Sequence, residues 1–259
     1  MDRRSIRLSQ TYIITGVSSG LGLELAKQLL ADGCRVIGLS RSNNENLRQC
    51  AQETGGEYSF YPVDLSEQDQ ASSILEQVID ALGREASTGK AAESSDILLV
   101  NNAAAVKPLK MIESCVPEEI AASIHLNVIA PIQLTASFIK LTEGWSGGRK
   151  IINISSGSAK YPAPGMSVYC CSKSALNMFS QCVAAEQEGK ERPVQIMVVN
   201  PGMMETGLQD EARHSDIPVT PYFIQAKEQG ALADPSVTAA KLLSAIRSAE
   251  PAAYMEFSL

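Results

Sequence analysis

The sequence is poor in the residue types that build metal sites. It holds only two histidines in 259 residues. Its six cysteines lack the paired spacing of zinc ligands; they are Cys34, Cys50, Cys115, Cys170, Cys171 and Cys182. We therefore expect no metal site, and we expect the cysteines to be reduced thiols that serve packing.

Basic residues are also scarce. Lysine and arginine number 22 against 29 aspartates and glutamates, which gives a formal charge of −7. Sequence-independent binding to nucleic acid depends on basic side chains that neutralise phosphates. The charge balance therefore argues against a nucleic-acid partner, and any phosphate is expected to be bound locally, as part of a small molecule.

No long apolar run follows the arginines near the N-terminus. The segment Met1–Gln10 carries Arg3, Arg4 and Arg7 without an apolar stretch behind them, so it resembles neither a signal peptide nor a membrane anchor. Hydrophobic residues make up 44% and charged residues 20%, which is typical of a globular protein. We expect a cytoplasmic protein without membrane contact, and a single domain over residues 1–259, because no repeat or composition break divides the chain.

Short aliphatic runs alternate with longer amphipathic stretches along most of the chain, which is the pattern of βαβ units. The expected strands are Tyr12–Thr15, Arg35–Leu39, Tyr58–Val63, Ile97–Val100, Lys150–Ile154 and Val194–Val199. Several are almost continuously apolar, as strands covered on both faces should be. The sequence predicts an α/β fold, a Rossmann-type doubly wound parallel sheet with helices on both faces. Its cofactor half would span about 10–105 and its catalytic and substrate half about 106–259.

Two segments do not fit this alternation. Gly83–Ser95 is small, polar and rich in glycine, serine and alanine, which indicates a surface loop. Met203–Ala233 mixes apolar and charged residues with two prolines, which indicates a long excursion of irregular or short helical structure. Long insertions of this kind are often lids or binding loops. Met203, Met204 and Tyr222 would then either line an apolar substrate pocket or pack the excursion onto the sheet.

A glycine-rich turn follows the first expected strand. It reads Gly16-Val-Ser-Ser-Gly20-Leu-Gly22 and leads into the helical run Leu21–Leu30. Glycines let the backbone approach a pyrophosphate, and the positive end of the helix attracts the anion. The alternative is an ordinary strand-to-helix turn. The position after the first strand favours cofactor binding, with contacts from Gly16, Ser18, Ser19, Gly20, Leu21 and Gly22.

The second expected strand ends in Ser40 and Arg41. NAD-binding proteins of this fold place an acidic side chain at this edge, whereas a 2′-phosphate requires positive charge. The pair therefore predicts NADPH as the cofactor, although Arg41 could also be a solvated surface residue. Further turns at the carboxyl ends of strands add contacts; they carry Asp64, Leu65, Asn102 and Ala103.

Tyr169 and Lys173 lie four residues apart in the helical segment Val168–Cys182, so both side chains leave the same helix face. An ammonium beside a phenol stabilises the phenolate and lowers the pKa of the tyrosine from about 10 toward neutrality. Ser156 lies 13 residues before the tyrosine, just past an expected strand, where its hydroxyl can donate to a substrate carbonyl. The three residues predict an acid–base site.

Asn127 lies in the helical stretch Pro117–Leu141, as a polar residue of the mostly apolar run Ile124-His-Leu-Asn-Val-Ile129. A buried amide must find hydrogen-bond partners. Asn127 is therefore either a structural strut or an element of a proton relay, and we expect the relay.

These motifs, in this order and spacing, resemble the short-chain dehydrogenase/reductase family along nearly the whole chain. The matching residues are Thr15-Gly-x-x-x-Gly-x-Gly22, Asn101-Asn-Ala103, Asn127, Ser156, Tyr169-x-x-x-Lys173, Pro201-Gly202 and Thr206. Ala104 departs from the glycine usual in the family. The Tyr-Cys-Cys-Ser-Lys run and the end in Glu256-Phe257 look most like the branch of sepiapterin reductases and bacterial benzil reductases.

The resemblance implies a carbonyl reductase that reduces a ketone or vicinal diketone with NADPH. Tyr169 would protonate the carbonyl oxygen that Ser156 polarises, and Lys173 would lower the pKa of the tyrosine and hold the ribose. Asn127 would support a water chain that reprotonates Tyr169. The family's carboxamide contacts fall on Pro201, Gly202 and Thr206.

The resemblance also implies a homodimer or homotetramer through the helices that carry Asn127 and Tyr169. It further suggests that Glu256 holds a polar, pterin-like substrate; the alternative is a solvated glutamate near the chain end. A rival function is an NADP(H)-binding regulatory or sensor protein on the same fold, because a fold does not establish turnover. The complete catalytic set disfavours that rival, since a sensor needs no proton donor.

Overall fold

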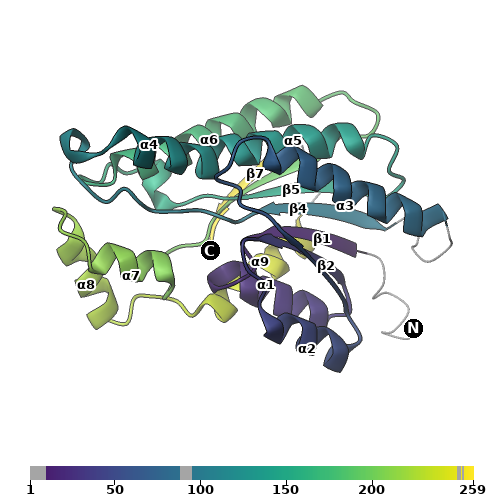
Figure 1. Cartoon of the computed structure of the whole chain (residues 1–259), viewed down its shortest axis with the longest axis horizontal. Coiled ribbons are helices and arrows are strands. Elements are labelled where there is room, and N and C mark those ends of the chain that lie inside the picture. The colour runs from purple at the N-terminus through teal and green to yellow at the C-terminus, as the bar shows by residue number, and fades with distance from the viewer. Residues whose placement is uncertain (1–9, 88–94, 250–251, 253) are drawn as a thin grey trace.

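The computed structural model describes residues 10–87, 95–249, 252 and 254–259. Among them, seven strands form one parallel sheet in the order β3-β2-β1-β4-β5-β6-β7 (Figure 1). The strands are β1 (Gln10–Thr15), β2 (Arg35–Ser40), β3 (Glu57–Pro62), β4 (Asp96–Asn101), β5 (Arg149–Ile154), β6 (Gln195–Asn200) and β7 (Tyr254–Ser258). The predicted Rossmann-type sheet is confirmed.

Helices cover both faces of the sheet (Figure 1). One layer contains α1 (Gly20–Ala31), α2 (Glu45–Thr54) and α9 (Pro235–Ser248). The opposite layer contains α3 (Gln70–Ser87), α4 (Pro117–Ile124), the π-helical turn η2 (His125–Ile129), α5 (Ala130–Leu141) and α6 (Ser167–Gln187). The sheet is therefore the middle of three layers.

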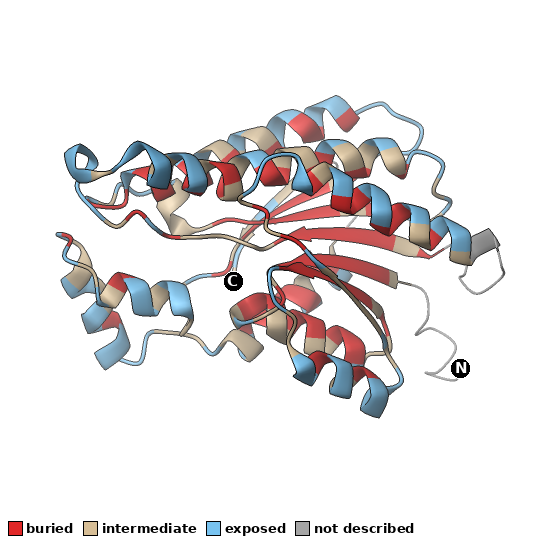
Figure 2. Ribbon diagram, viewed as in Figure 1, coloured by how far each residue is buried: buried red, intermediate tan, exposed pale blue. Residues whose placement is uncertain are grey.

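The central strands are buried on both sides, which explains their continuous apolar character (Figure 2). Successive side chains of a strand point to opposite faces. Tyr12 and Ile14 of β1 accordingly join the core under α1 and α9, whereas Ile13 joins the core under α3 and α5. Each face of the sheet thus has its own hydrophobic core, and the sheet edge where the strands end stays accessible.

Two local predictions differ from the structure. The six expected strands agree with the observed ones to within two residues, but the loop expected over Gly83–Ser95 is wrong for its first part, because α3 continues through Ser87. A glycine inside a helix costs about 1 kcal/mol, and burial of Ile79 and Leu82 on the same helix outweighs that cost. Residues 88–94 of the expected loop lie outside the described residues.

The seventh strand, β7, was not expected. Its sequence, Tyr-Met-Glu-Phe-Ser, has no aliphatic run, and it becomes a strand by pairing with β6. Strand formation depends on such pairing more than on intrinsic preference.

The excursion expected over Met203–Ala233 is confirmed and contains two short helices, α7 (Gly207–Arg213) and α8 (Thr220–Glu228). They project from the carboxyl edge of the sheet, at the left of Figure 1. Two single turns of 3-10 helix, η1 (Ile112–Ser114) and η3 (Gly157–Ala159), lie in the loops after β4 and β5.

Within the described part of the chain, one helical run is long and apolar enough to cross a membrane by length and composition, Pro117–Leu141, with a mean hydropathy of 1.3. In this fold it is the run α4–η2–α5, which packs against α3 and α6 and buries the polar Asn127. The core helix of a globular protein passes the same test.

Candidate active site

A cleft with a volume of about 1350 Å³ opens along the carboxyl edge of the sheet. It brings together residues from the ends of six strands and from the excursion with α7 and α8. The predicted cofactor and catalytic residues that line it are Gly16, Ser18, Ser19, Gly20, Leu21, Ser40, Arg41, Asp64, Leu65, Asn102, Ala103, Ser156, Tyr169, Lys173, Pro201, Gly202 and Thr206. Gly22 and Asn127 are not among the described residues of the lining and support it from behind.

The glycine turn after β1 is shaped for close approach. Gly16 and Gly20 have φ angles of +74° and +57°, which favour glycine. A Cβ on Gly22 would lie 2.2 Å from the carbonyl oxygen of Gly16, so a larger residue would force α1 away from the turn. Asn102 fixes the turn from β4, since its Nδ2 donates to the carbonyl oxygens of Thr15 (2.8 Å) and Gly16 (3.2 Å).

The N-terminus of α1 faces the same turn. Its N-cap residue, Ser19, makes no side-chain capping bond, which leaves backbone N–H groups of the first turn for a ligand. Free N–H groups and the positive end of the helix dipole together favour an anion such as a pyrophosphate. The turn and the helix end therefore fit the phosphates of a dinucleotide.

The end of β2 supplies positive charge to the cleft. Arg41 is exposed and lines the cleft beside Ser40, whose hydroxyl donates to the carbonyl oxygen of Ser42 at 2.7 Å. Across from it, the pKa of Asp64 lies below its ordinary value, mainly because the Ser66 hydroxyl donates to the carboxylate and also because Arg41 is near. This edge can therefore bind an anionic group next to the β2 terminus.

The side chains predicted to be catalytic meet at the floor of the cleft. Tyr169 and Lys173 project from the first turns of α6 and are 8% and 3% exposed. The Lys173 ammonium donates to the carbonyl oxygen of Ile154 at 2.9 Å and lies 5.8 Å from the centre of the Tyr169 ring. Ser156 comes from the end of β5 and hydrogen-bonds the Tyr169 phenol. The expected cluster of Ser156, Tyr169 and Lys173 is thus assembled.

Burial dominates the acidity of these groups. It raises the pKa of Tyr169 to about 12, partly offset by the hydrogen bond from Ser156, and it lowers the pKa of Lys173 to about 8. The direction for Tyr169 is opposite to the one expected from the sequence, because the ammonium bonds the backbone of β5 and the phenol loses its water. In this structure Tyr169 is a neutral proton donor throughout the ordinary pH range.

The Asn127 side chain acts as a strut. It lies in η2, where its Oδ1 accepts from the backbone N–H of Ala105 at 2.9 Å and its Nδ2 donates to the Ala105 carbonyl oxygen at 2.8 Å. The same Nδ2 lies 3.3 Å from Ser172 Oγ on α6. Asn127 therefore ties the loop after β4 to the catalytic helix, and of the two alternatives its side chain shows the structural one. The water relay stays a prediction.

Part of the cleft lining is apolar. Met203, Met204 and Tyr222 belong to it, as the sequence suggested. The sequence-based set missed Val106 and Val219, which also line the cleft. These residues come from the loop after β4 and from the excursion, where neither periodicity nor a motif marks an inward-facing side chain.

Glu256, the remaining predicted substrate contact, lies apart from these side chains. It is on the edge strand β7, where its carboxylate accepts from Lys160 at 2.6 Å and from the Tyr254 hydroxyl at 2.9 Å. The bond from Lys160 is the main reason that its pKa lies below the ordinary value. Glu256 is not among the described residues that line the cleft, so the structure shows the alternative of a surface glutamate. No local pattern in the sequence indicates that Lys160 pairs with Glu256.

Comparisons with known proteins agree with this geometry. A family model described as short chain dehydrogenase matches residues 10–216. Benzil reductase ((S)-benzoin forming) from Bacillus cereus is 36% identical over 92% of this chain and 94% of its own length. Sepiapterin reductase from Bos taurus is 30% identical over 95% of this chain and 93% of its own. The crystal structure of a metagenomic short-chain oxidoreductase in complex with NADP is 25% identical, with a TM-score of 0.70 over 97% of this chain and 98% of that one.

Proposed function

The chain belongs to the short-chain dehydrogenase family and is an oxidoreductase of the carbonyl reductase type, and we propose that it reduces an apolar ketone or vicinal diketone with NADPH. One observation carries the proposal. The buried Tyr169 and Lys173 and the half-buried Ser156 form a cluster at the floor of a cleft whose other end is a glycine turn with an open helix terminus. A proton donor and a dinucleotide cradle in one cleft are what carbonyl reduction requires.

Proteins of this family bind nicotinamide cofactors, and the residues present fit one. The cradle is the turn at Gly16, Gly20 and Gly22, where a Cβ would fill the space beside the backbone. Bound NADPH would supply the hydride. Arg41 supports NADPH over NADH, because a guanidinium binds phosphate through charge-assisted hydrogen bonds. Pro201, Gly202 and Thr206 line the same cleft after the end of β6, where the carboxamide would be held.

The chain's own residues provide the proton and orient the carbonyl. Ser156 Oγ already accepts from the Ser158 N–H at 3.2 Å, so its own proton is free to donate to Tyr169 or to a substrate oxygen. Tyr169 gives its proton to that oxygen as the carbonyl carbon is reduced, which yields the hydroxy compound. Lys173 ties α6 to the end of β5, and Asn127 ties α6 to the loop after β4, so both hold α6 in place beneath this site.

The substrate assignment rests on the character of the cleft. Its outer wall of Val106, Met203, Val219, Tyr222 and Phe223 offers apolar and aromatic surface, which suits aryl ketones. The Glu256 carboxylate is paired with Lys160 outside this wall. This apolar and aromatic part of the lining therefore supports an aryl diketone such as benzil.

Replacing Glu256 with glutamine should leave the KM of both a pterin ketone and benzil within about twofold of the original, because the loss of an exposed ion pair has a small effect. Initial rates with each substrate test this, with Glu113→Gln, on η1, as a control for loss of one surface charge. A KM that rises for the pterin alone would instead make Glu256 a substrate anchor.

Carbonyl reduction should lose efficiency above pH about 8. Burial lowers the pKa of Lys173 to about 8, so its ammonium is charged below that pH and neutral above it. Neutralisation removes the positive charge beneath Tyr169, and kcat/KM should fall tenfold for each further pH unit, roughly as expected for one essential acid. Rates between pH 6 and 10 with NADPH measure the profile. A flat profile up to pH 10 contradicts an essential charge on Lys173.

We also propose that the protein forms a homodimer or homotetramer. The helices that carry Asn127 and Tyr169 expose two large apolar side chains, Ile129 at 39% and Met178 at 59%. Such side chains on neighbouring helices favour burial against a second copy of the chain. A cytoplasmic location remains a prediction from the sequence.

The rival function, a regulatory protein that binds NADP(H) without turnover, would not require the buried cluster. An unused phenol and ammonium in an apolar interior are costly to keep. The complete set therefore favours an enzyme.

A further inference from the structure

The excursion between β6 and α9 is closed at its base by backbone pairing. Met204 pairs with Ala233 in a parallel bridge. The Ala233 N–H donates to the Met203 carbonyl oxygen at 2.9 Å, and the Glu205 N–H donates to the Ala233 carbonyl oxygen at 3.0 Å. The two ends of residues 203–233 therefore meet at one point, with Gly202 (φ +73°) on one side and the N-cap of α9, Asp234, on the other.

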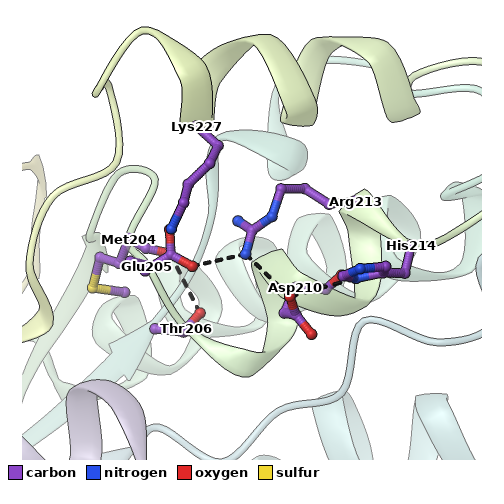
Figure 3. A network of polar contacts seen from close by, with 7 residues as sticks. All are labelled: Met204, Glu205, Thr206, Asp210, Arg213, His214 and Lys227. Carbon is purple, nitrogen blue, oxygen red and sulfur yellow. Dashed lines mark hydrogen bonds and ion pairs between the residues drawn. The ribbon is translucent and has the colours of Figure 1, made fainter.

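One carboxylate at this base joins both helices of the excursion (Figure 3). The Oε1 of Glu205 accepts from Arg213 Nη2 on α7 at 2.7 Å, and its Oε2 accepts from Lys227 Nζ on α8 at 2.5 Å. Arg213 is 11% exposed, so its guanidinium depends on this partner and on Asp210. The two cations, Lys227 first, hold the pKa of Glu205 below its ordinary value, so the crosslink is ionised at neutral pH.

The outer part of the excursion rests on the wall that carries the catalytic tyrosine. Ile217 packs in one apolar cluster with Val106, Met166 and Tyr169. This contact requires a glycine opposite, because a Cβ on Gly165 would lie 2.5 Å from the Cβ of Ile217. An ion pair also spans the cleft, between Lys107 after β4 and Glu211 on α7, at 3.7 Å.

The residue that follows Glu205 touches the cofactor turn. A Cβ on Gly20 would meet the Cγ2 of Thr206 at 3.5 Å, so Thr206 lies against the first residue of α1. Glu205 thus stands between a cofactor contact and the two helices that cover the substrate end.

We propose that Glu205 is a positioning residue that holds α7 and α8 together as one rigid unit. This unit moves as a whole about Gly202 and Asp234, and the movement places Ile217 beside Tyr169 and closes the substrate cleft. The role rests on the proposed carbonyl reduction. Without the Glu205 carboxylate, α8 loses its ion pair to the segment where the excursion begins. A smaller fraction of the molecules then has the closed cleft. The apparent affinity for substrate falls with that fraction.

Glu205→Gln keeps the size of the side chain and removes its charge. Hydrogen exchange should become faster in α8, over residues 220–228, while exchange in β1 and β4 stays unchanged. The KM for the carbonyl substrate should rise about fivefold, with kcat changed less than about twofold, as expected when partly exposed ion pairs are lost.

Asp32→Asn is the matched control, because it removes another exposed carboxylate, one that pairs with Arg247 between α1 and α9. It should leave α8 exchange and KM unchanged. The double variant Glu205→Gln with Lys227→Met should be no worse than Glu205→Gln alone, since Lys227 acts through the same carboxylate.

Each of three outcomes would overturn the proposed role of Glu205. They are unchanged hydrogen exchange in α8, an unchanged KM together with a lowered melting temperature, and additive effects in the double variant. Hydrogen exchange is measured on the protein without substrate, so it does not depend on catalysis. If the unmutated protein reduces no carbonyl compound, the proposed function fails by itself and the exchange result still decides the role of Glu205.

Discussion

Tyr169→Phe should abolish carbonyl reduction and leave NADPH binding almost unchanged. The substitution removes a single hydroxyl, and the ring keeps its place in the apolar cluster with Val106, Met166 and Ile217. What is lost is the proton that reaches the carbonyl oxygen, because the phenol, with its pKa raised to about 12, is the neutral donor of the site. General acid catalysis contributes about 10²- to 10⁴-fold to rates, so kcat should fall by at least a factor of about 100.

Two measurements separate the loss of the proton donor from a loss of cofactor binding or of the folded structure. Quenching or enhancement of NADPH fluorescence gives the dissociation constant of the cofactor, which should stay within about twofold because no cofactor charge is touched. Tyr161→Phe is the matched control, since Tyr161 also lines the cleft but is 72% exposed. Its kcat should stay close to the original. A fall of less than about tenfold for Tyr169→Phe would make the general-acid assignment wrong.

The unmutated protein should use NADPH in preference to NADH, and Ser40→Asp combined with Arg41→Ala should reverse that order. Arg41 supplies the positive charge at the end of β2, and Ser40 is its buried neighbour on the strand. A hydrogen bond to a charged group contributes about 1.5–3 kcal/mol. Removing the guanidinium and adding a carboxylate should therefore lower kcat/KM for NADPH by about 10- to 100-fold or more.

The comparison needs kcat/KM for both cofactors with one carbonyl substrate. Arg48→Ala is the matched control, because Arg48 is an exposed arginine of α2 outside the described lining of the cleft. It should leave the cofactor ratio unchanged. Equal kcat/KM values for NADPH and NADH in the unmutated protein would contradict the role given to Arg41.

Local sequence was enough to predict most of the sheet and the cofactor turn. The stretch Ile97–Val100 of β4 is apolar over its whole length because both faces of the strand are buried, and that signal needs no knowledge of the neighbouring strands. The turn at Gly16 and Gly20 is equally local, because a positive φ favours glycine. The spacing of Tyr169 and Lys173 follows from helix geometry alone.

The sequence by itself therefore determined the layered fold, the turns at the carboxyl edge of the sheet and the predicted catalytic side chains that meet there. Only the tertiary structure decided how those groups behave and what surrounds them. The pKa of Tyr169 rises because distant segments exclude water from it, Asn127 bonds the Ala105 backbone, and Glu256 pairs with Lys160. Each outcome depends on residues far apart in the chain, and neither periodicity nor spacing records which of them will meet.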